Sequence, residues 1–473
     1  METDTGSGFQ QDESFRDKFS TIGDDGNRSW IFPTKPKGPF YNKRTIASIV
    51  YLVLFFTIPF IKVNGDPILL LNILERKFII FGIVFFPQDL FLFALAMLTF
   101  MVFIVLFTAV FGRLFCGWAC PQTIFMEMVF RKIEYLIDGD ANAQRRLKNG
   151  PWTSEKIRKR ALKHFVFFAV SFLIANFFLA YFIGMDELIS IITEPVSTHL
   201  GGFVAILFFT GAFFFVYSWF REQVCLVVCP YGRLQGVLLD KDSIVVAYDY
   251  VRGEPRGVHK KNENNSNLGD CVDCGLCVRV CPTGIDIRHG TQLECVNCTA
   301  CIDACDSIMD KVEKPRGLIR YDSENGIKLG KKLSITPRMI GYAIVLLALV
   351  VGLGFGIGSR SKAEITILRA PGIMFQEIGT DSISNLYNYK VVNKSREELS
   401  VEISLDDFAG TIRGVGNSTN KFTIKRDGMQ EGTFFVIIHR KDLHGRKNKI
   451  AFRVSSQGEK LENYSTNFLG PVK

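Results

Sequence analysis

The chain has 473 residues, of which 48% are hydrophobic and 22% charged, and its formal net charge is +9. Its 43 Phe residues lie in runs, and apolar and charged residues are segregated along the chain, as a lipid environment requires. The positive charge gathers beside the apolar runs, which indicates membrane-flanking Lys and Arg rather than a nucleic-acid surface. The composition therefore argues against an ordinary soluble protein and against a nucleic-acid partner.

Five stretches are long and apolar enough to cross a bilayer, which takes about 20 residues. They are residues 45–61, 90–111, 162–183, 202–220 and 339–357. A shorter apolar stretch, 78–86, ends at Pro87, and we interpret it as an interfacial or re-entrant segment on the outer side. Residues 1–44 are polar and lack the apolar core of a signal peptide, so we expect the spans themselves to direct insertion.

The distribution of Lys and Arg predicts the orientation. Residues 1–44 hold seven and residues 112–161 hold ten, whereas residues 64–89 hold two and residues 185–201 hold none. The positive-inside rule therefore places the N-terminus and the loop after the fourth span in the cytoplasm, and the C-terminus outside. We expect the basic stretch from Arg145 to Arg160 to attract anionic membrane lipid.

Twelve cysteines carry most of the functional signal, and eight of them form two runs of the spacing C-x-x-C-x-x-C-x-x-x-C. The runs are Cys271, Cys274, Cys277 and Cys281, followed by Pro282, and Cys295, Cys298, Cys301 and Cys305, followed by Asp306. This spacing is typical of two-cluster ferredoxins, in which the fourth cysteine of each run binds the other cluster. The expected ligand sets of two [4Fe–4S] clusters are Cys271, Cys274, Cys277 and Cys305 for one and Cys295, Cys298, Cys301 and Cys281 for the other.

Two alternatives to clusters explain the eight cysteines less well. Zinc ribbons use C-x-x-C pairs separated by a longer gap and do not need the triple spacing. Disulfides are rare in the cytoplasm, where the orientation places this loop.

The other four cysteines form two C-x-x-x-C-P motifs, each just after a span. They are Cys116 and Cys120 after the second span and Cys225 and Cys229 after the fourth. Residues four apart on a helical turn share a face, so each pair can present two sulfurs to one point. Packing could explain one pair, but two pairs at the same depth indicate a copper site or an additional redox centre, because thiolates suit both. The two pairs could meet or act separately.

The remaining sequence completes the expected organisation. Residues 1–44 form a cytoplasmic segment, 45–220 four spans with their loops, 221–337 a cytoplasmic loop with the ferredoxin-like insert, and 338–358 the fifth span. Short alternating runs at 364–368, 387–392, 399–405, 421–425, 433–439 and 449–454 predict a β-sandwich over 359–473. The predicted fold is thus a five-span α-helical membrane protein with a two-cluster insert and an all-β C-terminal domain.

In combination, these motifs resemble the cytochrome c oxidase accessory proteins of the FixG/RdxA/CcoG type. The resemblance rests on the cysteine motifs, on residues 86–89 (Phe-Pro-Gln-Asp) and on residues 230–235 (Pro-Tyr-Gly-Arg-Leu-Gln); Asp306 in place of Pro departs from the pattern. It implies a bacterial inner-membrane protein with a periplasmic immunoglobulin-like C-terminal domain. It further implies reduction of copper(II) to copper(I) for a haem–copper oxidase, with oxidase assembly factors or copper carriers as partners and the two C-x-x-x-C-P pairs as the copper or redox site.

The resulting hypothesis is an electron relay in a cupric reductase. A cytoplasmic donor of unknown identity reduces the clusters, and the electrons reach copper(II) at Cys116, Cys120, Cys225 and Cys229. Two alternatives stay open: a quinol-linked ferredoxin of anaerobic respiration, and a copper-holding chaperone that transfers no electrons.

Overall fold

The computed structural model describes most of the chain. The described residues are 21–22, 27–63, 65–74, 77–81, 83–85, 90–258, 267–330, 336–359, 361, 363–372, 374–395, 397–406, 408–416, 420–426, 428–456 and 459–471. Residues 86–89, which contributed to the resemblance, lie outside them. The chain divides into two compact units, one reaching to Val351 and one beginning at Gly352, and the second also takes in residues 65–66 and 83–85.

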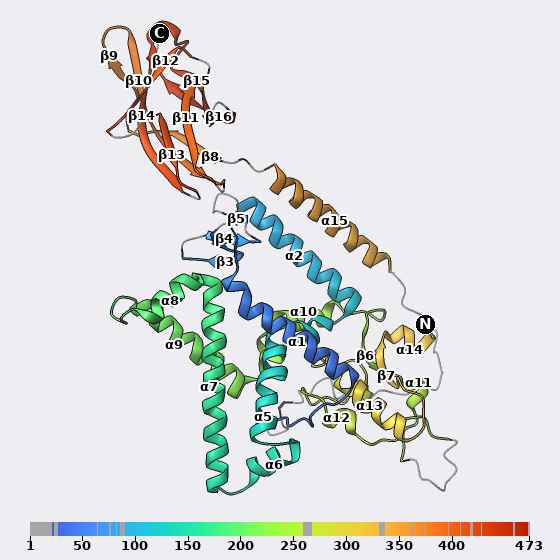
Figure 1. The fold of residues 1–473 in the computed structure, drawn as a ribbon. Helices are drawn as coiled ribbons and strands as arrows, with labels where there is room; N and C mark the ends of the chain where they lie inside the picture. The colour runs from blue at the N-terminus through green and yellow to red at the C-terminus, as the bar shows by residue number, and fades with distance from the viewer. Residues whose placement is uncertain are drawn as a thin grey trace. The chain divides into compact units, whose positions relative to one another are not determined.

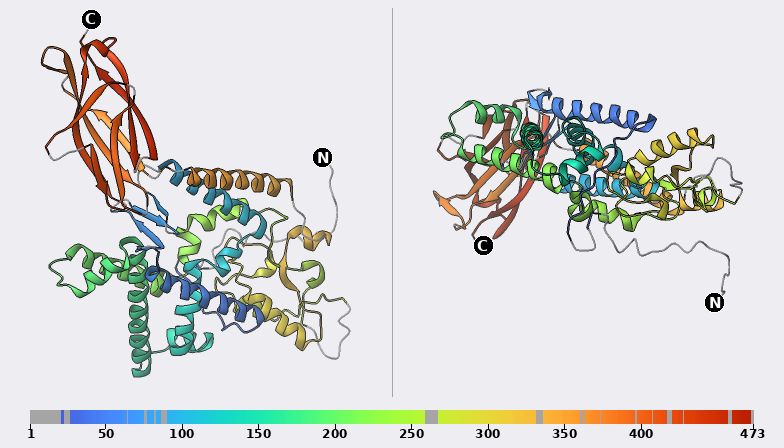
Figure 2. Two further views of the ribbon diagram at one scale, coloured as in Figure 1. Left: turned by 45° about the horizontal axis from the view of Figure 1, so that its top comes forward. Right: turned by 90° about the horizontal axis from the view of Figure 1, so that it is seen from below.

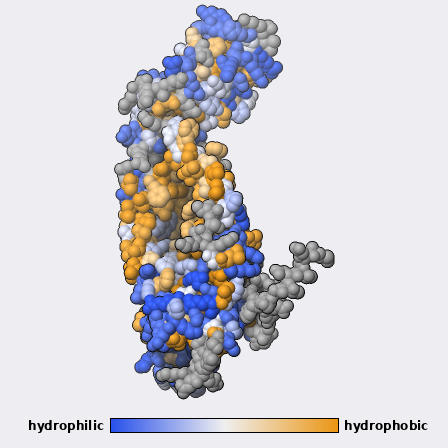
Figure 3. Space-filling model, turned by 90° about the vertical axis from the view of Figure 1, so that its right-hand side faces the viewer, coloured by the Kyte–Doolittle hydropathy of each residue, from blue (hydrophilic) through white to orange (hydrophobic). Residues whose placement is uncertain are grey.

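Among the described residues, five helices are long and apolar enough to cross a membrane, which confirms the predicted number of spans. They are α1 (Pro39–Thr57), α2 (Leu90–Phe111), α7 (Ser154–Ile183), α9 (Leu200–Phe215) continued by the π-helical η5 (Val216–Phe220), and α15 (Pro337–Gly358). Helices α7 and α9 pack side by side (Figure 1). On the face drawn in Figure 3, hydrophobic side chains gather over this helical part of the molecule.

Two spanning helices, α1 and α7, begin at least one full turn before their apolar stretches. Helix α7 starts eight residues before Leu162, because the Thr153 side chain accepts a hydrogen bond from the Lys156 amide and caps the N-terminus. Helix α1 starts at Pro39, a residue that suits the first helical turn because it has no amide hydrogen to satisfy. The extra turns carry charged residues, which hydropathy alone assigns to loops.

The stretch 78–86, interpreted as interfacial or re-entrant, contains strands. Strand β4 (Lys77–Ile80) pairs antiparallel with β3 (Leu69–Asn72), and β5 (Ile83–Phe85) follows. Nine apolar residues are too few for a spanning helix. The interfacial or re-entrant position of residues 78–86 stays a prediction.

The ferredoxin-like insert lies beside the N-terminal end of α1 (Figure 2). Strand β6 (Val245–Tyr248) pairs antiparallel with β7 (Ile319–Asp322), and α12 (Leu276–Arg279) and α13 (Ala300–Lys311) follow the two cysteine loops. The insert is tied to the first span, because the Asp303 carboxylate of α13 accepts hydrogen bonds from the amides of Phe40 (3.1 Å) and Tyr41 (2.7 Å). A carboxylate at a helix N-terminus is also favoured by the helix dipole.

The C-terminal domain is a sandwich of two antiparallel sheets. One sheet has the order β12 (Gly410–Gly414), β14 (Met429–His439), β10 (Ser382–Asn393), β8 (Ala363–Arg369), with β9 (Gln376–Ile378) paired to β10. The other has the order β13 (Lys421–Ile424), β11 (Leu399–Leu405), β15 (Lys447–Ser456), β16 (Glu459–Leu469). Alternate residues of both sheets face a shared core, in which Tyr387 stacks on Phe434 and both meet Phe452 edge to face, with ring centroids 5.5–6.0 Å apart. The predicted sandwich is confirmed; β9, β12 and β16 are additional strands.

Candidate functional site

The eight cysteines of the two runs line two small cavities in the sets expected for crossed ligation. We call the first set the first-cluster site and the second set the second-cluster site. The first-cluster site consists of Cys271, Cys274, Cys277 and Cys305, which line one small cavity. The second-cluster site consists of Cys281, Cys295, Cys298 and Cys301, which line another small cavity that Cys277 also reaches. The structure thus brings together the predicted sets, and iron ligation by each cysteine stays a prediction.

The two cysteine loops repeat the same backbone. Asp273 and Asn297, each just before the second cysteine of its run, have φ of 51° and 52°. Gly275 and Thr299, each just after it, have φ of 63° and 65°. A β-branched residue such as Thr299 rarely adopts a left-handed conformation, and such outliers cluster where a binding site imposes them. The loops are therefore wound tightly around the cavities.

The electrostatics of the second-cluster site fit a bound iron–sulfur cluster. Burial raises the pKa of the Cys295 thiol to about 12 and that of Cys298 to about 11, so several thiolates here need nearby positive charge, which iron supplies. Two buried arginines face this site: the charge of Arg44 acts on Cys298 and that of Arg113 on Cys295. Arg44 Nη2 and Arg113 Nε have no hydrogen-bond partner among the described residues. An anionic thiolate-ligated cluster is a counter-charge that both guanidinium groups require.

A single metal ion fits the cavities less well. Among the residues that the structure describes, no three side chains of His, Cys, Asp or Glu converge as the ligands of one ion would. A cubane needs a wider arrangement, because its four thiolates bind four different irons. The geometry therefore favours [4Fe–4S] clusters over zinc, whose ligands converge on one tetrahedral centre.

The two C-x-x-x-C-P motifs adopt one local fold, and proline is its cause. Cys116 lies in α3 (Leu114–Trp118) and Cys225 in the π-helical η6 (Val224–Val228). Cys120 and Cys229 are extended, with ψ of 125° and 110°, because the residue before a proline avoids the helical region. Each proline then begins the next helix, α4 (Pro121–Thr123) or α10 (Pro230–Leu238). The expectation of one continuous helical turn per pair was therefore wrong.

The paired cysteines nevertheless stay close. The Cys120 amide donates to the Phe115 carbonyl (2.9 Å) and the Cys229 amide to the Val224 carbonyl (2.8 Å), so both motifs close the same six-residue turn. Irregular π-helical turns of this kind are frequent at functional sites.

The two pairs lie close enough to affect each other electrostatically, although no three of their sulfurs converge as the ligands of one ion would among the described residues. Burial, followed by the neighbouring Cys120 thiol, raises the pKa of Cys116 and of Cys225 to about 12, and Cys229 acts on both in the same direction. Cys116 also acts on Cys225, and its own Sγ lies 3.3 Å from Gln235 Oε1. We call this group the membrane thiol site; its members are Cys116, Cys120, Cys225 and Cys229. Whether it binds a metal stays a prediction.

The membrane thiol site packs directly against the second-cluster site. A Cβ at Gly117 would lie 2.5 Å from the carbonyl oxygen of Asn297 and 2.6 Å from that of Val296, so only glycine permits this approach. The Gly117 carbonyl accepts a hydrogen bond from Arg44 Nε (2.7 Å). On the other side of the turn, the Trp118 indole donates to the Tyr321 hydroxyl (3.0 Å), which lies 3.3 Å from the Asn297 carbonyl. Sequence spacing gave no sign of this contact.

Replacing Gly117 with Ala tests the contact. Because the added methyl group meets backbone rather than a flexible side chain, we expect a loss of about 1–3 kcal/mol of stability. We also expect slower electron transfer between the clusters and the thiol site. Thermal unfolding and stopped-flow reoxidation of the reduced protein measure both effects. Gly211→Ala in α9 is the matched control, because nothing lies within 4 Å of its Cβ position; equal behaviour of the two variants would contradict the contact.

A network of buried charges lies beside Cys225 of the thiol site, and the sequence analysis missed it. We call it the buried ion network; its members are Glu127, Arg131, Glu134, Asp138, Lys163, Arg221 and Glu222. Glu134 accepts two hydrogen bonds from Arg221 (2.9 and 2.7 Å), and Lys163 lies 2.5 Å from Asp138. Arg221 itself has a φ of 55°, an outlier for a side-chain-bearing residue. Glu127, Arg131, Glu134 and Asp138 lie at helical spacing on one segment, whereas Lys163, Arg221 and Glu222 come from distant parts of the chain, so spacing could have grouped only the first four.

Comparisons with known proteins agree with this architecture. Residues 220–324 match the model of a 4Fe-4S dicluster domain, residues 93–138 that of a 4Fe-4S binding domain, and residues 353–471 that of the Ig-like fold at the C-terminus of FixG. The nitrogen fixation protein FixG of Rhizobium meliloti is 34% identical over 439 residues, which cover 83% of this chain and 82% of FixG. The proteins RdxA and RdxB of Cereibacter sphaeroides are 34% and 32% identical over 398 and 406 residues. These cover 81% and 82% of this chain, and 83% and 84% of the relatives.

The relatives align over most of both chains, and the matched domains coincide with the cysteine cavities, the spanning helices and the β-sandwich described above. The resemblance seen in the motifs is thereby confirmed at the level of the family. The chain belongs to the FixG/RdxA family of membrane-bound iron–sulfur electron-transfer proteins.

Proposed function

We propose that this protein is a cupric reductase, in which electrons held at the two cluster sites reach the membrane thiol site and reduce copper(II) to copper(I). The copper(I) is then passed to assembly factors or copper carriers for a haem–copper cytochrome c oxidase. The observation that carries the proposal is the backbone contact between Gly117 and residues 296–297, which joins the thiol site to the second-cluster site without an intervening layer.

The cluster sites and the membrane thiol site have different roles in the proposed reaction. A [4Fe–4S] cluster, when bound, supplies reversible one-electron chemistry at each cluster site. Arg44 and Arg113 stabilise negative charge there, and Arg44 also orients the Cys116 turn through the Gly117 carbonyl. The four thiols provide soft ligands, which favour copper(I) over copper(II) and so assist a one-electron reduction. Each copper(II) ion takes up one electron and leaves as copper(I).

The proposal includes an orientation. The Lys and Arg distribution supports a cytoplasmic N-terminus and a periplasmic C-terminal domain in a bacterial inner membrane. Copper reduction would then occur at the cytoplasmic ends of the second and fourth spans. Labelling of single added cysteines in intact cells, at Ser29 and at Ser400, tests this assignment.

The decisive experiment replaces one cysteine of each membrane pair with Ser. The double variant Cys116→Ser, Cys225→Ser should retain the visible spectrum of both clusters and lose cupric reduction by the dithionite-reduced protein, because the copper ligands are removed and the cluster ligands are not. A chelator specific for copper(I) measures the product. Ser307→Ala, on the exposed side of α13, is the control. Undiminished reduction by the double variant would place the copper site elsewhere.

The same assay separates reduction from simple holding of copper. A copper chaperone binds the metal without changing its oxidation state, even when the clusters are reduced. Copper(I) appearing in proportion to the electrons lost from the clusters supports the reductase.

A further inference from the structure

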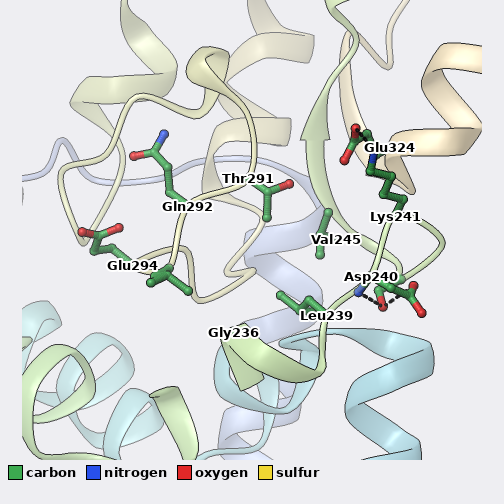
Figure 4. A pocket seen from close by; sticks show the side chains of 11 residues that line it. Gly236, Leu239, Asp240, Lys241, Val245, Thr291, Gln292, Glu294 and Glu324 are labelled. Atoms are coloured by element: carbon green, nitrogen blue, oxygen red, sulfur yellow. Dashed lines mark hydrogen bonds and ion pairs between the residues drawn. The ribbon is translucent and has the colours of Figure 1, made fainter. Parts of the chain in front are cut away.

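A cavity of about 390 Å³ opens beside the loop that leads into Cys295 (Figure 4). Its walls are residues 239–245, which connect α10 to β6, the loop 291–294, and Glu324 at the start of α14 (Glu324–Leu329). The volume lies in the range of sites for small organic molecules, and it is much larger than the space needed for ordered water. Nothing in the proposed copper chemistry uses it.

The cavity adjoins the second-cluster site. Leu293 and Glu294 line it and are followed directly by the ligand Cys295. The Leu293 side chain lies against Gly236, where an added Cβ would come within 2.4 Å of it. The Leu293 carbonyl accepts a hydrogen bond from Arg113. A molecule in this cavity therefore contacts the same loop that surrounds the second-cluster site.

The cavity also lies where two spans end. The Ser243 hydroxyl donates to the Ala109 carbonyl (2.8 Å) and the Ile244 amide to the Val110 carbonyl (3.1 Å), which fixes one wall to the last turn of α2. Asp240 pairs with Arg338 (3.6 Å) in the first turn of α15. Leu293, which lines the cavity, is 64% exposed, and Val237, the residue after the lining residue Gly236, is 81% exposed. Such a position is accessible to a ligand dissolved in the membrane.

The lining combines an apolar floor with a polar side. In Figure 4, Val245 and Thr291 point toward the centre, and Asp240, Lys241 and Glu324 lie together at one side. This combination suits a flat ring that buries its faces and presents hydroxyl groups to carboxylates. The second-cluster site adjoins the cavity, and together with the first-cluster site it could take up the two electrons that such a donor releases.

We propose that this cavity binds a dihydroquinone from the membrane, which serves as the electron donor of the relay. The dihydroquinone loses two electrons and two protons and leaves as the quinone. The two electrons are shared between the two cluster sites, and the two protons pass to carboxylates at the cavity mouth and then to water. The role of the dihydroquinone as electron donor rests on the proposed function. Its binding in the cavity does not.

The test fills the cavity and measures binding separately from electron transfer. Thr291 is exposed in the loop and points inward, so Thr291→Trp should occupy the cavity without disturbing the core. With the holoprotein in detergent, calorimetric titration of duroquinone should show saturable binding that Thr291→Trp weakens about tenfold or more. Leu293→Trp is a second variant with the same expectation. Thr411→Trp, at an exposed threonine of the β-sandwich, is the control and should bind as the original protein does.

Reduction of the clusters by duroquinol then tests whether the bound molecule is the electron donor. Duroquinol should bleach the visible absorbance of the clusters in the original protein and in the Thr411→Trp control, and fail to do so in the two cavity variants. Dithionite should reduce all of them, and the reduced cavity variants should still convert copper(II) to copper(I). No saturable duroquinone binding, or equal binding by the filled variants, overturns the proposal. Binding and bleaching without any cupric reduction would refute the cupric reductase and leave the donor site standing.

Discussion

Replacing Cys281 with Ser should abolish the second cluster and spare the first, although Cys281 belongs to the first cysteine run. The structure places Cys281 in the cavity with Cys295, Cys298 and Cys301, while Cys305 lies with the first three cysteines of the other run. Cysteine thiolates are strong and specific cluster ligands, so losing one of four is expected to prevent stable assembly. Iron in an anaerobic preparation should fall from about eight to about four atoms per chain.

Double variants make this result diagnostic. If Cys281 and Cys298 share a cluster, Cys281→Ser, Cys298→Ser should lose no more iron than Cys281→Ser alone. The double variant Cys281→Ser, Cys274→Ser should lose both clusters. Ligation within each run predicts the reverse order, so the iron content of two preparations decides between the two arrangements.

Replacing Glu134 with Gln should strongly destabilise the protein at neutral pH. Burial alone would raise the pKa of this carboxyl, but Arg221 and Lys163 outweigh it and hold the pKa at about 2. Removing the charge leaves Arg221 and Lys163 buried without their shared partner, and breaking such a buried pair costs about 3–5 kcal/mol. Thermal unfolding in detergent measures the loss. The control is Glu155→Gln, because Glu155 pairs with Lys159 at 2.7 Å on the surface, where removal should leave the unfolding temperature unchanged.

The pH dependence of that loss has a definite sign. The pKa of Glu134 is lower in the folded than in the unfolded protein, so its ionisation stabilises the fold above the unfolded value of about 4.3. That contribution is lost as the pH falls from there toward about 2. The difference in unfolding temperature between the original protein and Glu134→Gln should therefore be largest at pH 7 and should decrease below about pH 4. A gap independent of pH would show that charge pairing is not what Glu134 contributes.

The strands of the C-terminal domain show where local patterns suffice. Strands β8, β10, β11, β13, β14 and β15 alternate apolar and polar residues, and all were expected. Strand β12 is bounded by Gly410 and Gly414, and β16 carries Phe468 among mostly polar residues, so neither has a clear period of two. Their strand conformation comes from pairing with β14 and β15, which supply the hydrogen bonds that their own sequences do not predict.

The cysteine motifs show the same division at the functional site. Their spacing was enough to predict two clusters and their crossed ligand sets, and the proline after Cys120 and Cys229 already explains the extended turn found there. Spacing could not show that the two pairs, separated by more than a hundred residues, come together beside Asn297. That juxtaposition depends on the absence of a side chain at Gly117 and on hydrogen bonds from Arg44 and Trp118.

The sequence by itself determined the five membrane spans, the two iron–sulfur runs and the β-sandwich, because each depends on the solvent preference or spacing of neighbouring residues. Only the tertiary structure decided which thiols lie near each other, which charges pair inside the protein and where the cavity beside Cys295 lies. The buried ion network and the cavity beside Cys295 are built from residues that are distant in the chain. Their energies depend on burial and approach distance, which arise only when the helices and the insert pack together.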